Sequence, residues 1–265
     1  MTSVWQEVAD RVWIRRYESL DQTIGAIGGD AGLAVIDTRA THRLADELRD
    51  DLRQLPGDLV AVVNTHGHWD HAFGNARFAP VPIWAHVRCA AFMAETGEAA
   101  RARLIDSYPD EADDFREVVL SPPTDSFEES ASIDLGGRRL DLRYLGRGHT
   151  DNDIVAVVPD ASVLFAGDLL ENAPAPAFGD SFPISWPVSG LALLGLVDGT
   201  VVPGHGDPFD RGFAERQIGE LALLAELARE AVSGAIGLED AVRRSPFPEH
   251  ETGEALERAR LELSE

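Results

Sequence analysis

The chain has 265 residues, 44% hydrophobic and 26% charged, which is typical of one globular domain with a sizeable core. Its formal net charge is −23 and it contains no lysine, so its surface should repel phosphate backbones and anionic bilayers, which argues against a nucleic-acid or membrane partner. The single cysteine excludes an intrachain disulfide, and neither a signal-like apolar segment nor a run of about 18 apolar residues is found, so we expect a cytoplasmic protein.

The first elements predict an antiparallel meander followed by a helix. Residues 8–37 alternate short β-type runs with turns that contain Gly or Asp. Thr41 can cap a helix that extends to about Leu52, and Pro56-Gly57 then precedes an apolar run at 59–64. We interpret that run as a buried strand.

The segment after this strand carries most of the chemistry, and it reads Thr65-His66-Gly67-His68-Trp69-Asp70-His71. In an extended loop the side chains at i, i+2 and i+4 point the same way. His66, His68 and Asp70 can therefore face one point while His71 turns to a neighbouring one. Such a pattern indicates a paired-metal site rather than a set of surface-loop histidines.

Three other residues of this half are interpreted as structural. His42 begins the first helix and is a solvated helix residue; His86 ends a strand at 81–85 and has no second metal-competent neighbour. Cys89 is a small apolar filler on a helix at 87–94. Residues 95–130 are acidic and interrupted by prolines, which predicts helices and loops outside the core.

The β pattern returns from residue 132, with a hairpin at 133–140 and strands at 140–145, 154–158, 163–166 and 201–202. His149, Asp168 and His205 each follow a short apolar β run. Each one alone is more readily structural, but sites in α/β folds gather where strand ends meet loops. Together with the first cluster, these residues predict one shared site.

A Pro-rich segment at about 171–190 has two interpretations: a wall of the substrate pocket or a packing strap. As a wall it would supply substrate contacts, with Trp69 added from the first motif: Trp69, Asn172, Phe178, Phe182 and Trp186. Residues 213–265 are predicted to be a helical extension packed on the domain formed by 1–212, with a homodimer contact as the alternative.

The ordered set of three histidines and Asp70, then His149, Asp168 and His205, resembles the metallo-β-lactamase-fold hydrolase superfamily. The resemblance implies an α/β fold, a four-layer αβ/βα sandwich with the metal site at one edge of its sheets. It also implies three ligands for a first metal, three for a second and a bridging carboxylate, in this order: His66, His68 and His149; Asp70, His71 and His205; and Asp168.

Nitrogen-rich ligation with carboxylates suits two zinc ions, although iron or manganese fits the same donors. Zinc lowers the pKa of bound water to about 7, so a bridging hydroxide is the expected nucleophile, and Asp70 or a metal-bound water is the expected general acid. Thiolates and alkoxides leave with little help, whereas an amine must be protonated. We therefore expect a hydrolase acting on a small-molecule ester, thioester or lactone.

The motif details point to a generic hydrolase branch, glyoxalase II-like and similar to quinoprotein-relay proteins. Glyoxalase II-like members usually continue the third histidine as His-Thr-Pro-Gly, where this chain has His149-Thr150-Asp151-Asn152, and true β-lactamases have Cys or Ser where Asp168 stands. Two alternatives stay open. One is a mononuclear iron persulfide dioxygenase that uses His66 or His71 with His149 and Asp168. The other is a non-catalytic metal-binding module.

Overall fold

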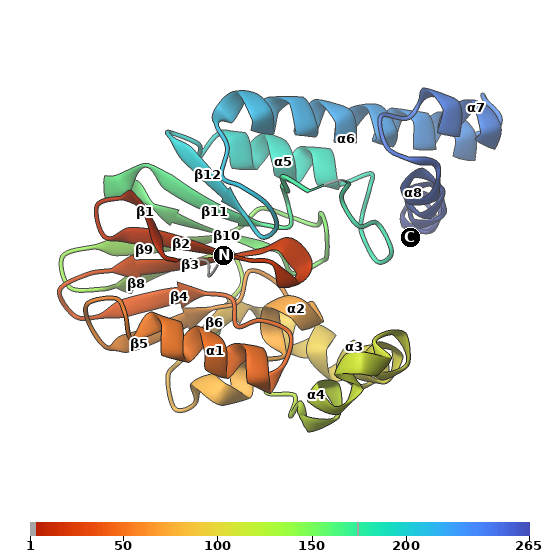
Figure 1. The fold of residues 1–265 in the computed structure, drawn as a ribbon. Coiled ribbons are helices and arrows are strands. Elements are labelled where there is room, and N and C mark those ends of the chain that lie inside the picture. Colours follow the sequence, from red (N-terminus) through yellow and green to blue (C-terminus); the bar gives the residue numbers. More distant parts are fainter. Residues whose placement is uncertain (1–3, 174) are drawn as a thin grey trace.

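The computed structural model describes residues 4–173 and 175–265, and its strands form two sheets that lie face to face (Figure 1). The first sheet has seven strands in sequence order: β1 (Gln6–Ala9), β2 (Val12–Tyr17), β3 (Gln22–Gly28), β4 (Leu33–Ile36), β5 (Leu59–Val63), β6 (Ile83–His86) and β7 (Asp125–Phe127). The second has five, in the spatial order β12 (Thr200–Pro203), β11 (Val163–Gly167), β10 (Ile154–Val158), β9 (Arg139–Tyr144) and β8 (Ser130–Asp134).

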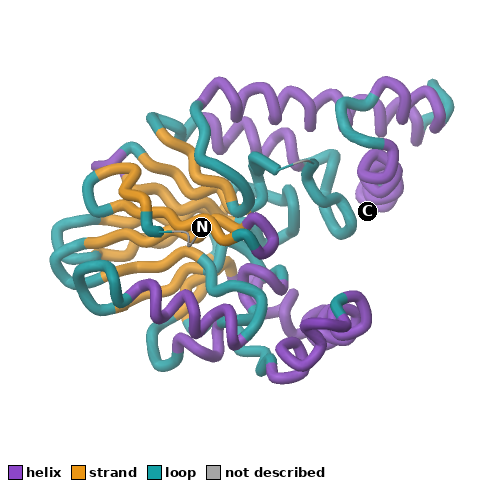
Figure 2. The backbone as a smooth tube through the Cα atoms, viewed as in Figure 1, coloured by secondary structure: helices purple, strands orange, loops and turns teal. Residues whose placement is uncertain are grey.

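Helices lie on the outer faces of the two sheets. Their bounds are α1 (His42–Leu52), α2 (Trp69–Ala72), α3 (Val87–Ser107), α4 (Ala112–Glu117), α5 (Trp186–Leu194), α6 (Arg211–Val232), α7 (Leu238–Arg244) and α8 (Glu249–Glu262). Figure 2 shows the strands as one block with helices on either side, short turns at one end of the strands and longer loops at the other. Among the helices that the structure describes, none combines the length and apolar character needed to cross a bilayer.

Alternation along the strands explains why each sheet is covered on both faces. In β4, Ala34 and Ile36 point between the sheets, whereas Leu33 and Val35 point outward toward Leu48 of α1. The second sheet behaves in the same way. Phe165 faces the first sheet, whereas Leu164 packs beneath α5 and α6. The expected four-layer sandwich is therefore confirmed.

The antiparallel meander and the first helix also agree with expectation. Strands β1 to β4 pair antiparallel in order, and β4 then pairs parallel with β5. Thr41 caps α1 by accepting a hydrogen bond from the backbone N–H of Leu44. Because β4, β5 and β6 run parallel, their carboxyl ends meet at one edge of the first sheet.

The segment at 95–130 differs from expectation in one respect. Besides helices it contains the strand β7, which pairs parallel with β6 through Trp84 and Asp125. The strand is only three residues long and buries a single apolar side chain, Phe127. A run this short has no periodicity that sequence analysis could detect.

The helices after residue 210 pack on α5 and on one another. Leu224 and Ile218 of α6 lie against the outer face of the second sheet, and Leu227 lies in a separate cluster with Leu256 of α8. Figure 1 shows α7 and α8 beyond the end of the sheets, on the side where the loops gather. The C-terminal helices therefore lie close to the loop edge rather than to the middle of the sandwich.

Candidate metal centre

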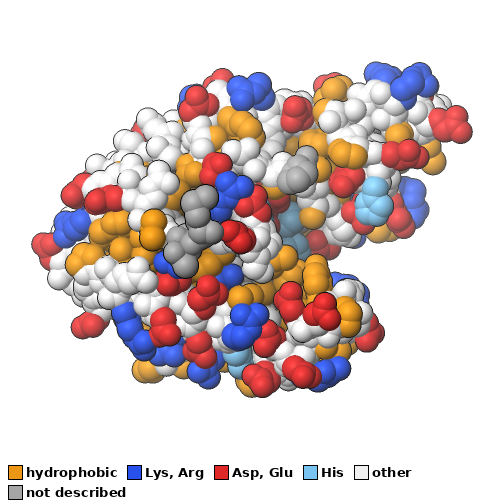
Figure 3. All heavy atoms as spheres, in the orientation of Figure 1, with side chains coloured by type: hydrophobic (Ala, Val, Ile, Leu, Met, Phe, Trp, Pro, Cys, Tyr) orange, Lys and Arg blue, Asp and Glu red, His pale blue; other side chains and the backbone are white. Residues whose placement is uncertain are grey.

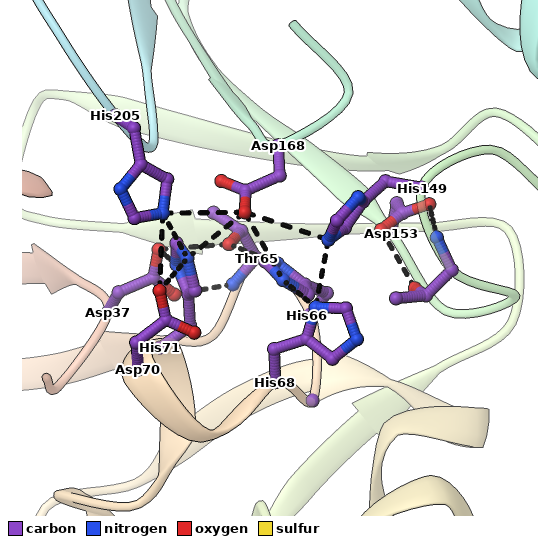
Figure 4. Close-up of polar contacts among 12 residues, drawn as sticks. Asp37, Thr65, His66, His68, Asp70, His71, His149, Asp153, Asp168 and His205 are labelled. Carbon is purple, nitrogen blue, oxygen red and sulfur yellow. Dashed lines mark hydrogen bonds and ion pairs between the residues drawn. The ribbon is translucent and has the colours of Figure 1, made fainter. Parts of the chain in front are cut away.

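The predicted ligands come together at the loop edge of the two sheets (Figure 4). Strand β5 leads into the segment 65–71, β11 ends immediately before Asp168, and β12 ends immediately before Gly204-His205. His149 lies in the loop between β9 and β10. Segments that are far apart in the chain thus supply one site because their strands end at the same edge.

Three imidazole nitrogens form the first cluster. Nδ1 of His68 lies 3.0 Å from Nε2 of His66 and 2.8 Å from Nε2 of His149. In a tetrahedral site with Zn–N bonds of 2.0–2.1 Å, ligand nitrogens are about 3.3 Å apart. The three nitrogens therefore need only a small expansion to hold such an ion. Three imidazole nitrogens suit zinc among other transition metals.

A second cluster contains Asp70, His71 and His205. Nε2 of His205 lies 3.2 Å from Oδ2 of Asp70 and 3.3 Å from Nε2 of His71, and the latter two atoms are 3.4 Å apart. All three facing atoms are within 4.8 Å of one another, as they are in the first cluster. One carboxylate and two imidazoles thus converge on a second point.

Asp168 lies between the two clusters. Its Oδ2 is 3.6 Å from Nε2 of His149 in the first cluster, and 3.3 and 3.5 Å from Nε2 of His71 and His205 in the second. Its Oδ1 is buried and has no hydrogen-bond partner among the described residues. A buried carboxylate oxygen without a partner is costly, and a cation at this position would satisfy it. This position would allow the carboxylate to contact an ion in either cluster.

Burial and charge divide the histidines into two groups. Burial holds the pKa of His66 well below its usual value and lowers that of His149 to about 4, so both rings are neutral and offer lone pairs at neutral pH. Burial also disfavours the charged form of His205, but Asp168 outweighs it and raises the pKa to about 12. A metal entering the second cluster must therefore displace protons.

Asp37 is a partner of the site that the sequence analysis missed. It follows β4, is 1% exposed, and its Oδ2 accepts a hydrogen bond of 2.8 Å from Nδ1 of His71. The same carboxylate accepts hydrogen bonds from the backbone N–H and the hydroxyl of Thr65. With its Nδ1 proton held by Asp37, the ring of His71 presents the Nε2 lone pair to the second cluster. The signal was present, because Asp37 follows an apolar strand as Asp168 does.

Two further contacts orient the rings of His68 and His205. Nε2 of His68 lies 2.9 Å from Oδ2 of Asp180, and Nδ1 of His205 lies 2.7 Å from the carbonyl oxygen of Leu20. Each contact leaves the other ring nitrogen to face its cluster. Asp180 belongs to the Pro-rich loop, where no local pattern marks it as a partner of His68.

The clusters open into a cavity of about 700 Å³. The motif residue Trp69 lines it, as expected, and so do Phe73 and Phe92. The opposite wall is made by small residues of the Pro-rich loop, namely Ala173, Ala175, Ala177 and Gly179. Figure 3 shows histidine side chains in the hollow that opens between helices α3 and α4 and the C-terminal helices. The Pro-rich loop is thus a wall of the site through its small side chains.

The larger side chains of that loop do not line this cavity, contrary to the expected substrate contacts. Phe178 and Trp186 are 0% exposed and pack on each other, and Trp186 donates a hydrogen bond from Nε1 to the carbonyl oxygen of Leu169. Phe182 lies beside an adjacent, smaller hollow. Asn172 donates to the carbonyl oxygen of Asp207. Apolar rings satisfy the hydrophobic effect best against the core, so they act as the packing strap.

Glu171 is a second residue that the sequence analysis did not single out. It is 6% exposed, lines the cavity, and has a carboxylate oxygen within 4.8 Å of the facing atoms of His149 and Asp168. Burial first, and then the negative charge of Asp168, hold its pKa well above its usual value. It lies three residues after Asp168, at the start of the loop.

The residues interpreted as structural lie outside the site. His86 stacks on Tyr144 with ring centroids 3.9 Å apart, and its Nε2 lies 3.0 Å from the carbonyl oxygen of Glu128. Nε2 of His42 accepts a hydrogen bond from the backbone N–H of Val119. Cys89 is fully buried in a small apolar cluster, and burial raises the pKa of its thiol.

Comparison with known proteins places the chain in a family. The family model described as "Metallo-beta-lactamase superfamily" matches residues 20–205, which include all seven predicted ligands. The metallo-beta-lactamase type 2 of Bacillus cereus is 27% identical over 188 residues, which cover 68% of this chain and 65% of that protein. The hydroxyacylglutathione hydrolase of a Synechococcus strain is 26% identical over 140 residues, 53% of this chain and 44% of that protein.

Solved structures resemble the fold over most of the chain. A metallo-beta-lactamase from Pontibacter korlensis has a TM-score of 0.66 and 21% sequence identity, and the match covers 83% of this chain and 99% of that one. At this level of identity the likeness concerns the fold alone. The curated relatives differ in the reactions that their names describe, so the substrate must be argued from the site.

Proposed function

The chain belongs to the metallo-β-lactamase superfamily, and we propose that it is a dinuclear zinc hydrolase that cleaves an ester, thioester or lactone of a small molecule. One observation carries the proposal. Oδ2 of Asp168 faces nitrogen atoms of two separate ligand clusters, at 3.3 to 3.7 Å. Superfamily membership with these His and Asp groups supports a metal-dependent hydrolase, and the two metals, their identity and the bond cleaved are our inference.

The residues of the two clusters would hold the ions, with His66, His68 and His149 around one and Asp70, His71 and His205 around the other. When bound, zinc supplies a water activated near neutral pH and a Lewis acid for the substrate carbonyl. Asp37 fixes the ring of His71, and Asp180 fixes the ring of His68. This outer support keeps the ligand atoms in place before any substrate arrives.

Asp70 has a second part in the proposal. Burial disfavours its charge, but His71 and His205 outweigh it and hold its pKa well below the usual value, so the carboxylate stays ionised. It lines the cavity and would accept a hydrogen bond from the attacking water, which orients that water toward the carbonyl carbon. The residue would therefore serve both as ligand and as positioning group.

The lining favours substrates with good leaving groups. Within the described part of the chain, the only histidines that line the cavity are His68, His149 and His205, all in the ligand clusters, and no tyrosine lines it. A thiolate or alkoxide leaves without prior protonation, which an amine requires. Esters, thioesters and lactones need no such acid, and they are the substrates that we propose. A reducing, cytoplasmic location is part of the same proposal.

The test starts with metal content. Protein purified without a metal-binding tag should contain close to two zinc ions per chain by plasma mass spectrometry, and it should hydrolyse members of a panel of aryl esters, thioesters and lactones. Replacing the bridging carboxylate, Asp168→Ala, should lower both second-site occupancy and turnover. Asp113→Ala, which removes an exposed carboxylate from α4, is the matched control.

Two results would contradict the proposal. Full turnover with one metal bound in Asp168→Ala would exclude the two-metal mechanism. One iron per chain, with oxygen uptake in the presence of glutathione persulfide, would assign the dioxygenase alternative instead. A chromogenic cephalosporin in the same panel tests the reaction that the Bacillus cereus relative's name describes.

A further inference from the structure

Among the described residues, Asp180 is the one carboxylate that holds an outer ring nitrogen of the first cluster, meaning a nitrogen that faces away from it. Its Oδ2 lies 2.9 Å from Nε2 of His68. Nδ1 of His66 lies 3.1 Å from the hydroxyl oxygen of Thr65, and Nδ1 of His149 is buried without a hydrogen-bond partner in the described part of the chain. With its Nε2 proton held by Asp180, His68 presents the Nδ1 lone pair to the cluster. The ring direction of His68 therefore depends on where Asp180 lies.

The turn that carries Asp180 has little packing of its own. It belongs to the Pro-rich loop, outside the helices and strands, and the Asp180 side chain is 45% exposed. A Cβ at the preceding Gly179 would meet no atom of the described residues within 4 Å. The position of the carboxylate must therefore come from contacts with other parts of the chain.

Arg258 of α8 makes such contacts. Its Nε donates a hydrogen bond of 3.0 Å to the carbonyl oxygen of Ser181, and its Nη2 donates one of 3.2 Å to the carbonyl oxygen of Asp180. One turn further along α8, Glu262 accepts hydrogen bonds from the backbone N–H groups of residues 184 and 185. A guanidinium presents its donors in a planar fork, so it can hold two carbonyl groups at once. Arg258 thus holds two successive peptide groups at the position of Asp180.

The segment 180–182 also supports the loop of His149. The backbone N–H of Phe182 donates to the carbonyl oxygen of Gly148 at 2.8 Å, and His149 follows Gly148 directly. The guanidinium carbon of Arg258 lies 5.6 Å from the centroid of the Phe182 ring, within reach of a cation–π contact. One arginine therefore holds a segment that contacts two of the three ligand segments of the first cluster.

The second cluster has different supports. His71 is held by Asp37, and His205 by the carbonyl oxygen of Leu20, so neither ring is held through α8. Helix α8 also lies outside residues 20–205, the part of the chain that the superfamily model matches. Loss of an α8 contact should therefore affect the first cluster selectively.

We propose that Arg258 is a positioning residue for the first metal. It holds segment 180–182, and through that segment it keeps the ring of His68 and the loop of His149 in the arrangement that binds the ion. The inference rests on the proposed function only in treating the first cluster as a metal site. It gives the C-terminal helices a part in metal binding, although they supply none of the predicted ligands.

The test measures metal binding by the full-length, metal-stripped protein, so it does not require turnover. Cobalt(II) is titrated in place of zinc, because its visible absorbance reports both occupancy and ligand geometry. The binding step that is lost in His68→Ala is assigned to the first cluster, and the step that is lost in His205→Ala to the second. Arg258→Met removes the donors and keeps an unbranched apolar side chain. Arg260→Met, which removes an exposed arginine from the same helix, is the matched control.

We expect Arg258→Met to lower the affinity of the first cluster about tenfold and to change the spectrum of the ion bound there, because partners that orient metal-binding histidines usually contribute about 10- to 100-fold. The second step should change little. Arg258→Lys, whose ammonium lacks the fork, should lose about threefold. Wild-type affinity in Arg258→Met, an equal fall in both steps, or an equal fall in Arg260→Met would overturn the inference.

A double-mutant cycle tests the route through Asp180. Asp180→Ala alone should weaken the first cluster by about 10- to 100-fold. Adding Arg258→Met to that variant should then lower the affinity by less than about threefold more, because the contact through which Arg258 acts is already lost. A further loss of about tenfold would mean that the two residues act independently, which contradicts the proposed route.

The wild type supplies a measurement that needs no variant. Because coupling between two sites is reciprocal, filling the first cluster should slow hydrogen exchange of the backbone amides of Ile184 and Ser185, which donate to Glu262 of α8. Exchange that the ion leaves unchanged at these amides would overturn the inference, even if a variant fails to fold.

Turnover separates this inference from the proposed function. Absence of hydrolysis across the panel of esters, thioesters and lactones, together with the expected loss in the first step, would refute the hydrolase and keep the positioning role. Hydrolysis by the wild type, with an unchanged first step in Arg258→Met, would keep the hydrolase and refute the positioning role. A wild-type protein that binds no cobalt in the first cluster would refute both.

Discussion

Replacing Asp37 by asparagine should weaken the second metal site without removing any of its ligands. The carboxylate is 1% exposed; its Oδ1 accepts from the backbone N–H of Thr65, and its Oδ2 accepts from Nδ1 of His71 and from the Thr65 hydroxyl. An asparagine oxygen can keep the bond to the Thr65 backbone. Its amide N–H₂ would then face Nδ1 of His71, where it favours the wrong tautomer.

The expected size of the effect follows from the contact that is lost. A hydrogen bond to a charged group contributes about 2 kcal/mol, which corresponds to about a 30-fold change in an equilibrium constant. Carboxylate partners of metal-binding histidines usually affect metal affinity by about 10- to 100-fold. We therefore expect the affinity of the second site to fall about 30-fold, while that of the first site changes little.

The assay is a zinc titration of metal-stripped protein in competition with a chromophoric chelator, which resolves the two binding steps. Asp51→Asn is the matched control, because Asp51 is also a buried carboxylate, paired with Tyr17 and Arg15 away from the site. Equal zinc affinity in Asp37→Asn and wild type would refute the argument that Asp37 orients His71. An equal loss in the Asp51 variant would assign the effect to general destabilisation.

Three other predictions concern packing, pH and reactivity. A Cβ at Gly204 would lie 2.0 Å from Oδ1 of Asp168. Gly204→Ala should therefore displace the bridging carboxylate and abolish binding of the second metal in the same zinc titration. Binding of two metals by the Gly204→Ala protein would contradict this prediction. In the metal-free protein, His149 has its pKa lowered from about 6.5 to about 4, so its contribution to stability is present above pH 6.5 and lost as pH falls through 4, by up to about 3 kcal/mol. The free energy of unfolding in urea should therefore fall less between pH 7 and pH 5 in His149→Asn than in wild type. An equal fall in both proteins would exclude the effect. Because burial raises the pKa of Cys89 and encloses its thiol, iodoacetamide should label it only after unfolding, as followed by intact mass; rapid labelling of the native protein would show that this region opens.

The strands and the ligand clusters could be anticipated because their signals are local. A β-branched run followed by three histidines and an aspartate occupies one short stretch, and each later candidate also follows a strand. The direction of the His71 ring has no local signal. It depends on Asp37, which follows β4, and β4 becomes the neighbour of β5 only once the sheet has formed.

The expected substrate contacts show where sequence reasoning lacks information. Aromatic residues in a long loop indicate order, but not which way the rings face. Phe178 and Trp186 turn to the core because apolar partners are available there, and small residues of the same loop, Ala173 and Ala175 among them, face the cavity. Glu171 and Asp180 have no periodic context, and only the path of the folded loop brings them to the metal centre.

The loop that walls the cavity is held from outside by α8. Arg258 donates hydrogen bonds to the carbonyl oxygens of Asp180 and Ser181, and Glu262 accepts hydrogen bonds from the backbone N–H groups of Ile184 and Ser185. All seven predicted ligands precede residue 206, so α8 contributes none of them. Substitutions on this helix can therefore change the shape of the cavity wall without replacing any predicted ligand. In evolutionary terms, the wall can diverge through a helix that lies outside the ligand segments, with Asp180 as the point where the two remain linked.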